Sequence, residues 1–221
     1  MGKRLPQTER TRLRRMSERG HFDAKTIHEI LDAMPMCHIG YVLEGSPVVM
    51  PTIQWRIDNH VYWHASSGGR GVKAWTRSSV CLTVSLLDGF VLARSGLHHS
   101  VNYRSVMIFG QPSLIADSSQ KRDRLNGLIE AIYPGRNKIL RPISDSELKR
   151  TAVLSLPIRE ASAKIRSQGP VDDEADYDLP IWAGTVPVRI KLMAPQPDSR
   201  NLDGLVVPDH VRDLRVGEMI P

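Results

Sequence analysis

The feature that most constrains the fold is a succession of short apolar runs, each separated from the next by residues typical of tight turns. Three turn signals stand out: Glu44-Gly45-Ser46-Pro47, Asp58-Asn59 and Asp88-Gly89. The apolar runs around them predict strands at residues 37–43, 48–57, 60–65, 80–87 and 90–94. Because strands joined by such short turns pair antiparallel, a doubly wound parallel sheet is disfavoured. The predicted fold class is therefore mainly β (α+β), a small antiparallel barrel with peripheral helices.

The rest of the chain contains helical patterns and further strands. Asp23 is a suitable N-cap for a helix that runs to Met34 and stops at Pro35. Further helices are predicted at residues 72–77, 118–133 and 144–149, and further strands at 103–116 and 151–165. Gly110 is expected to mark a bulge or bend in the first of these strands. Pro51 cannot donate a ladder hydrogen bond, so we expect it at a sheet edge or a bulge.

Charge and composition divide the chain into three parts: a basic arm (residues 1–22), a barrel domain (23–166) and a polar, proline-containing extension (167–221). The net charge is +6, from 30 basic and 24 acidic side chains, and the first 20 residues hold seven of the basic ones against two glutamates. Such an arm can bind nucleic acid or anionic lipid, but we favour a solvated terminus or a strap across a partner subunit. The nearly neutral remainder argues against a nucleic-acid-binding function. The extension is expected to pack on the barrel or on a partner subunit, without a core of its own.

Several observations point to a cytoplasmic, reduced protein. The charged start with Pro6 has no apolar segment of the kind found in secretory signals. No apolar stretch approaches the ~18–20 residues that a membrane-spanning helix needs. Cys37 and Cys81 have neither metal-ligand spacing nor a C-x-x-C pattern, and we expect both to be buried.

The candidate site lies where a predicted strand passes through a Ser/Gly loop into a helix, at Tyr62 to Lys73. No nucleophile-elbow, zinc-protease or P-loop motif is present. Hydroxyls, backbone N–H groups, a helix N-terminus and two cations are suitable partners for a phosphate, which suggests Ser66, Ser67, Arg70 and Lys73. An ordinary flexible turn is the alternative, and composition alone does not separate the two.

Three further positions have both a functional and a structural interpretation. Arg104, at the start of a strand, is either a surface charge or a contact to the same phosphate. Trp182 is either a packing anchor for the extension or a cover for a planar ligand. His98 and His99 are adjacent, and adjacent residues on a strand point apart, so a shared metal is not expected.

At this point the chain resembles the flavin-nucleotide-binding split barrels related to pyridoxamine 5'-phosphate oxidase, and within them the branch of the 5-nitroimidazole-resistance proteins. The resemblance runs from about Arg12 to Pro187. Its pieces, in order, are Arg14-Arg15 with Arg19 to Asp23, Val48 to Thr52, Tyr62 to Ala65, Asp88 to Val91, Asn102 to Val106 with Phe109-Gly110, Ser162 to Arg166 and Trp182 to Pro187. Their order and spacing together carry the resemblance. The pyridoxal-phosphate-binding residues of the oxidase itself are not found.

The resemblance implies a six-stranded split barrel that forms a homodimer with FMN in two interface grooves. It implies that Met50, Pro51, Thr52 and Ile53 line the flavin ring and that the Ser/Gly loop, Arg70 and Lys73 hold the phosphate. Further contacts are implied for Arg104 and Ser105, for Trp182 from the partner's extension, and for His64 as a catalytic or substrate-contact residue.

The leading functional hypothesis is an FMN-dependent oxidoreductase that reduces small electrophiles such as nitroaromatics or quinones with a nicotinamide donor. The first alternative is a flavin-binding, sensory or stress protein without turnover. The second is the same fold holding a deazaflavin or haem. The sequence alone assigns its histidines, among them His38, His60, His64, His98 and His99, to packing or surface positions rather than to haem.

Overall fold

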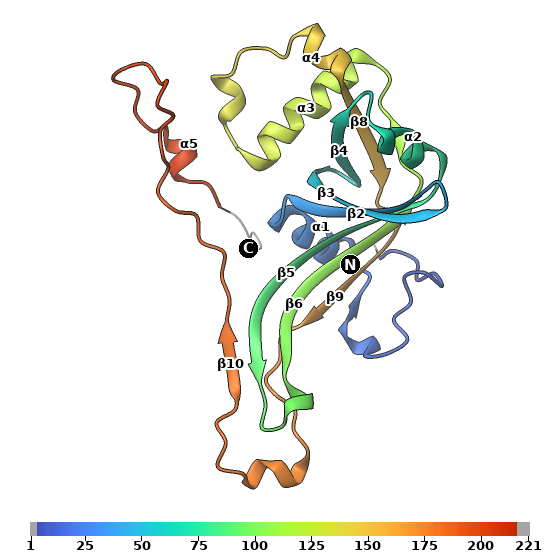
Figure 1. The fold of residues 1–221 in the computed structure, drawn as a ribbon, viewed down its shortest axis with the longest axis vertical. Helices are drawn as coiled ribbons and strands as arrows, with labels where there is room; N and C mark the ends of the chain where they lie inside the picture. Colours follow the sequence, from blue (N-terminus) through green and yellow to red (C-terminus); the bar gives the residue numbers. More distant parts are fainter. Residues whose placement is uncertain (1–3, 216–221) are drawn as a thin grey trace.

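The computed structural model describes residues 4–215, which form a long, bent antiparallel sheet flanked by helices (Figure 1). These residues contain a ten-stranded sheet in the order β1-β9-β6-β5-β2-β3-β4-β8-β7, with β10 paired to β5. β1 and β7 lie at the two ends of this order, so the described strands do not close into a continuous hydrogen-bonded barrel. The predicted split-barrel class is confirmed. The resemblance implies six strands. The described sheet has more because β1, β7 and β10 are short additional strands and because residues 151–165, predicted as one strand, form β8 and β9.

The strands are β1 Gly20–His21, β2 Met36–Leu43, β3 Ser46–Ile57, β4 His60–Ser66, β5 Val80–Leu92, β6 Ser100–Gly110, β7 Ser113–Leu114, β8 Thr151–Pro157, β9 Glu160–Arg166 and β10 Gly184–Pro187. The α-helices are α1 Ala24–Ala33, α2 Arg70–Arg77, α3 Ser118–Ile132, α4 Asp145–Arg150 and α5 Asp209–Arg212. Short 3-10 helices are η1 Ser17–Arg19, η2 Gly96–His98, η3 Arg136–Lys138 and η4 Glu174–Asp178. Within residues 4–215, no helix has both the length and the apolar character needed to cross a membrane.

The main core lies between α1 and the inward-facing side chains of the sheet. Ile27, Ile30 and Leu31 of α1 are completely buried there, together with strand residues such as Leu82. α1 begins as predicted, because the Asp23 carboxylate accepts a hydrogen bond from the backbone N–H of Thr26 at 2.8 Å. A second, smaller core forms beneath α3, from Trp55, Tyr62, Leu125, Leu148 and Val153.

The first two turns are confirmed. Glu44 and Gly45 have φ values of 52° and 80°, and Asp58 has a φ of 52°, as tight hairpin turns require. Pro51 lies where β3 pairs with β2 alone, so its missing N–H interrupts no second ladder, in agreement with the expected edge position.

The predicted hairpin at Asp88-Gly89 is wrong. β5 runs through both residues as one strand with a bulge between Leu87 and Gly89, and the chain turns only after Leu92. β6 pairs with both halves of β5, while the Asp88 carboxylate accepts hydrogen bonds from Arg104 instead of capping a turn. Position 89 favours glycine, because an added Cβ would lie 3.0 Å from the backbone oxygen of Val186 and would push β10 outward by a few tenths of an ångström.

Two other strand predictions also need correction. Residues 151–165 form two strands. β8 pairs with β4 and β7, whereas β9 pairs with β6 and β1. The chain therefore crosses from one half of the sheet to the other at Ile158-Arg159. The Ile158 N–H donates to the Asn59 carbonyl oxygen at 2.9 Å and fixes this crossing. The strand predicted at 103–116 ends at Gly110, and Pro112 separates it from β7.

The two ends of the chain differ in how they meet the barrel. The N-terminal arm packs onto it: Leu5 is buried, and Arg10 forms an ion pair with Glu160 of β9. The C-terminal extension adds β10 to the edge of β5 and then leaves the sheet (Figure 1). Residues 189–206 are exposed along their whole length, which agrees with an extension that has no core of its own.

Candidate functional site

β3 and β4 pair over only four residues each and then separate. The last pair is Gln54 with Trp63; before it, β3 keeps β2 as its strand partner, and after it β4 keeps β8. Residues 50–53 and 64–66 are therefore the two arms of an opening, which we call the β3–β4 fork. Each arm has one edge with no strand partner among the described residues, and such an edge offers backbone N–H and C=O groups to a ligand.

The four predicted ring-lining residues lie on one arm of the fork but not on one face. Pro51 and Ile53 are exposed on the outer face of the sheet, opposite His38 and Met36 of β2. Met50 and Thr52 alternate to the inner side, where Met50 packs against the main core.

The predicted phosphate loop follows the other arm. Gly69 is the N-cap of α2, and the Ser67 N–H donates to the Arg150 carbonyl oxygen at 2.9 Å, which ties the loop to the end of α4. Ser66, Ser67, Arg70 and Lys73 are all exposed, and neither cation forms an ion pair with another described residue. These four residues follow one arm of the fork directly in the chain, and their polar groups are accessible. Their role as phosphate ligands stays a prediction.

Arg104 lies on β6, next to the bulge in β5. Its guanidinium makes two hydrogen bonds to the Asp88 carboxylate, at 2.7 and 2.9 Å, and its side chain is 13% exposed. It pairs with Leu86 of β5, six residues from Val80. Arg104 therefore lies about 20 Å along β5 from the point where the chain enters that strand after α2. Ser105 is next to Arg104 but faces the outer side, where it pairs with Ser85.

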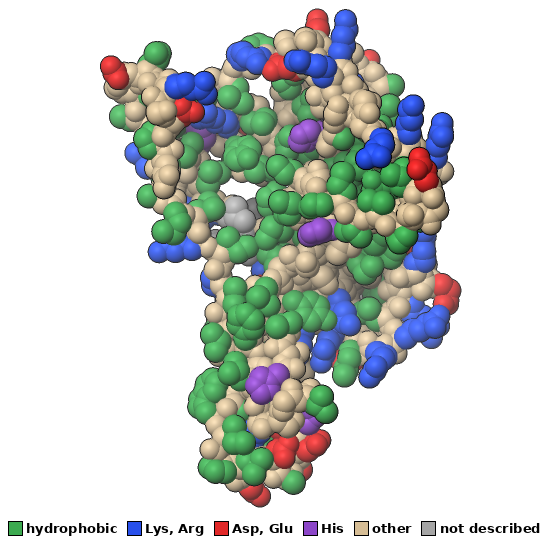
Figure 2. Space-filling model, viewed as in Figure 1, with side chains coloured by type: hydrophobic (Ala, Val, Ile, Leu, Met, Phe, Trp, Pro, Cys, Tyr) green, Lys and Arg blue, Asp and Glu red, His purple; other side chains and the backbone are tan. Residues whose placement is uncertain are grey.

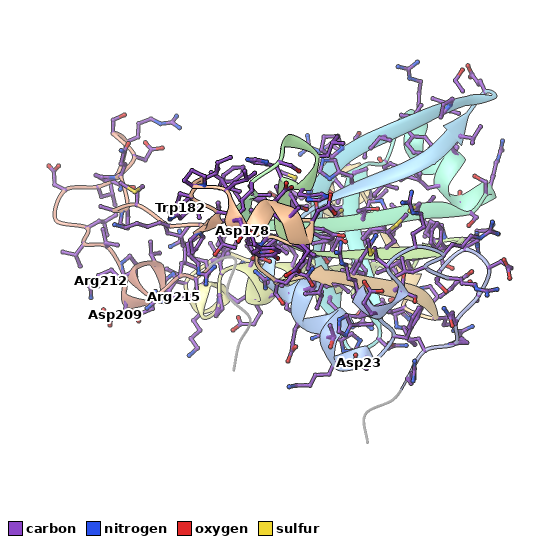
Figure 3. All side chains as sticks on the ribbon, turned by 90° about the horizontal axis from the view of Figure 1, so that it is seen from below. Asp23, Asp178, Trp182, Asp209, Arg212 and Arg215 are labelled. Carbon is purple, nitrogen blue, oxygen red and sulfur yellow. The ribbon has the colours of Figure 1, made fainter. Side chains whose placement is uncertain are left out.

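Trp182 stands near the start of β10 and is 68% exposed (Figure 3). Its indole lies against Gly184, where an added Cβ would come within 2.9 Å of Trp182 Cζ2. The ring is therefore held in position by its own segment while leaving most of its surface free.

A pocket of about 740 Å³ that the sequence analysis did not predict lies beside the fork, between β4, α3 and the segment leading to α4. Its apolar lining is Leu125, Leu128, Ile129, Leu140 and Ile143. The signal that could have located it is α3: Leu125, Leu128 and Ile129 lie at helical spacing on one face, yet among the residues of this helix only Leu125 is buried.

His64 lines this pocket and also begins one arm of the fork. Its Nδ1 is buried and has no hydrogen-bond partner among residues 4–215. Burial lowers the pKa of His64, so the imidazole is neutral at pH 7. On the polar side of the pocket, Arg141 and Glu147 form an ion pair at 2.6 Å.

One group of potential metal ligands occurs in the described part of the chain, at the far tip of the β5–β6 ribbon. His98, Asp172 and Asp176 place ligand atoms within 4.8 Å of one another. The Asp172 carboxylate already accepts hydrogen bonds from the Arg94 backbone N–H and Nη1, both at 3.0 Å. This group locks the start of the extension to the ribbon. His99 instead bonds the Ser95 carbonyl, so the two adjacent histidines have different partners, as expected.

Comparisons with known proteins agree with this architecture. The family model described as "Pyridoxamine 5'-phosphate oxidase" matches residues 23–165. No curated protein sequence matches the chain. Among solved structures, the flavocytochrome Anf3 from Azotobacter vinelandii is 43% identical with a TM-score of 0.92, over 96% of this chain and 100% of that one.

Two further structures are similar. The FAD and heme binding protein from Mycobacterium smegmatis is 30% identical with a TM-score of 0.86, over 90% of this chain and 98% of that one. A candidate 5-nitroimidazole antibiotic resistance protein from Bacteroides thetaiotaomicron is 26% identical with a TM-score of 0.54, over 65% of this chain and 84% of that one. The family match, the open split barrel and these relatives lead to one conclusion: the chain belongs to the pyridoxamine 5'-phosphate oxidase family.

Proposed function

We propose that this protein is a redox protein that binds both a flavin and haem. Two relatives that cover at least 90% of the chain support this, one named a flavocytochrome and the other an FAD and heme binding protein. The observation that carries the haem part is the pocket beside the fork, with the half-buried imidazole of His64 in its wall.

The residues of this pocket fit a haem group. A neutral imidazole is the common protein ligand of haem iron, and burial keeps His64 neutral. The volume of about 740 Å³ is in the range of cofactor pockets, and five aliphatic side chains supply apolar walls. His64 would hold the iron, and the aliphatic side chains of α3 would exclude water. Arg141, which also lines the pocket, would pair with a carboxylate of the haem. The haem alternative, which the sequence alone did not support, thus gains a specific ligand.

The flavin is assigned to the β3–β4 fork. Backbone groups of residues 50–53 and 64–66 are suited to the polar edge of a flavin ring, and the cations of α2 are suited to its phosphate. We propose FAD, because the 30% identical relative is named for it; FMN, implied by the sequence resemblance, is the second candidate. The bound cofactors would supply one- and two-electron chemistry, while the chain positions them.

The test compares two histidines of the same strand. His60 lies on the same face of β4, four residues from His64, and does not line the pocket. In protein produced with added haem precursor, His64→Ala should lose the Soret band, and His60→Ala should keep it. Added imidazole should restore part of the band to His64→Ala, because it can occupy the vacated ligand position.

Equal haem content and an unchanged Soret band in His64→Ala would refute His64 as the ligand. The identity of the flavin is read separately, from the mass of the cofactor released by heat denaturation.

Reduction of nitroaromatics or quinones is the second candidate activity, supported by the 26% identical relative. Its test is acceptor-dependent NADH or NADPH oxidation by protein that carries its flavin, in wild type and in His64→Ala.

A further inference from the structure

The tip of the β5–β6 ribbon holds a group of side chains that the proposed function does not use. His98 ends η2 at this tip, and the segment that follows β9 crosses it with Asp172 and with Asp176 of η4 (Figure 1). We call these three residues the tip triad. Each of them places one ligand atom within 4.8 Å of the ligand atoms of the other two. Residues that are more than 70 positions apart in the sequence are thus brought together as one set of donors.

Asp172 is the buried member of the triad. Its side chain is fully buried, and Arg94 donates to both of its oxygens, from the backbone N–H to Oδ1 and from Nη1 to Oδ2, each at 3.0 Å. An ionised carboxylate has about four lone-pair sites, so these bonds leave it able to accept more. Carboxylates that bind metal ions are themselves hydrogen-bonded, which fixes their orientation. Arg94 therefore holds Asp172 in place for a ligand without using up its acceptor capacity.

His98 gives independent evidence that a ligand is bound. Its Nδ1 is buried, yet this nitrogen has no hydrogen-bond partner among residues 4–215. It lies 3.6 Å from Asp172 Oδ1, which is too long for a hydrogen bond. Two ligand atoms that bind one zinc ion at about 2.1 Å, with a tetrahedral angle between them, are about 3.4 Å apart. The distance between His98 and Asp172 is therefore close to that of two ligands sharing one ion.

The charge around the tip triad favours a cation. Residues 172–178 contain five acidic side chains and no Lys or Arg. Figure 2 shows acidic side chains gathered beside histidine side chains at the lower end of the molecule. Arg94 balances one of these charges, that of Asp172. Asp176 is only half-buried, so its carboxylate can turn toward an ion held by the other two ligands.

We propose that the tip triad binds a divalent transition-metal ion, zinc, through His98 Nδ1 and the carboxylates of Asp172 and Asp176. An imidazole nitrogen together with carboxylate oxygens suits zinc, whereas calcium and magnesium prefer oxygen ligands alone. Three protein ligands leave the fourth tetrahedral position to water. The ion would fasten the start of the C-terminal extension to the ribbon. This inference does not depend on the flavin or haem assignments.

The experiment measures Zn²⁺ binding to the full chain by isothermal titration calorimetry, after bound metal has been removed by dialysis against EDTA. His98→Ala and Asp176→Asn should each weaken Zn²⁺ binding by about tenfold or more. His99→Ala is the matched control, because His99 is the next residue and its Nδ1 bonds the Ser95 carbonyl oxygen at 2.9 Å instead. The affinity of this variant should equal that of wild type. Circular dichroism shows whether each variant is folded.

Hydrogen exchange supplies a readout that locates the ion. Zn²⁺ should slow the exchange of residues 172–178 in wild type and in His99→Ala, but not in His98→Ala. Equal Zn²⁺ affinity in the two histidine variants would overturn the inference. So would a wild type that binds no Zn²⁺ at about 100 µM, or one that binds Zn²⁺ with unchanged exchange of residues 172–178.

Discussion

Gln54 offers the sharpest test of how the fork is built. Its side chain is 2% exposed, and its Nε2 donates to the carbonyl oxygens of Leu31 at 2.7 Å and Met34 at 2.8 Å. These carbonyls lie at the C-terminal end of α1, where helix carbonyls run short of donors; the Leu31 oxygen also accepts a long hydrogen bond from the Met34 N–H at 3.4 Å. Gln54 is also the last residue of β3 that pairs with β4. One side chain thus connects the end of α1 to the point where the strands separate.

Gln54→Leu removes both hydrogen bonds and nearly keeps the volume. Each bond contributes about 1 kcal/mol net, and each buried carbonyl left without a donor costs about 1–3 kcal/mol. Met34 is only partly buried, so its carbonyl can recover water. The expected loss in the free energy of unfolding is therefore about 2–3 kcal/mol, measured by urea denaturation at an unchanged m-value.

Gln111→Leu is the matched control. Gln111 also donates through Nε2 to a carbonyl oxygen, that of Thr76 at 2.7 Å, but on the surface. Because water replaces that bond, the expected loss is about 0.5 kcal/mol or less. If Gln54→Leu were no more destabilising than Gln111→Leu, the assignment of Gln54 as the cap of α1 would be wrong.

Three further predictions follow from ion pairs and burial. Arg104→Ala and Asp88→Ala should each lower the free energy of unfolding by about 1–2 kcal/mol, with a double-mutant coupling of similar size; a coupling near zero would show that the pair does not stabilise the bulge. The ion pair with Arg10 lowers the pKa of Glu160 in the folded protein. The contribution of this pair to anchoring the N-terminal arm is therefore complete above the ordinary carboxyl pKa of about 4.3, and it is lost as the pH falls through the lower pKa of the folded state. Faster hydrogen exchange of residues 8–12 at pH 3 than at pH 7, after correction for intrinsic rates, checks this, and equal corrected rates would contradict it. Burial raises the pKa of Cys37 to about 12, so iodoacetamide at pH 8 should leave Cys37 unmodified in folded protein by mass spectrometry; rapid labelling would contradict its burial.

Local signals predicted the elements whose ends are set by nearby residues. Asp23 caps α1, Ser144 forms a capping box at α4, and Asp58 turns the chain between β3 and β4. The resemblance predicted the arrangement of these elements, which no single motif specifies. The assignment of the Ser/Gly loop and residues 50–53 to one flavin site stays a prediction.

Predictions failed where a distant partner decides the local structure. Asp88-Gly89 has the composition of a hairpin turn, but pairing with β6 and the approach of β10 keep it extended. Two hydrogen bonds from the Arg104 guanidinium go to Asp88, a partner 16 residues away that the sequence did not indicate, and the role of Arg104 as a phosphate ligand stays a prediction. The pocket beside His64 depends on α3 standing away from β4, a spacing that no short stretch of sequence encodes.

The most direct test of the functional proposal is the cofactor content of the purified protein. Haem is measured as its pyridine complex, flavin by the mass and amount released on denaturation, and both are divided by the chain concentration. The account predicts about one haem and one flavin for each chain, both retained through gel filtration. A protein that retains flavin but takes up no haem, even when haemin is added, would contradict the proposal that the pocket at His64 is a haem site.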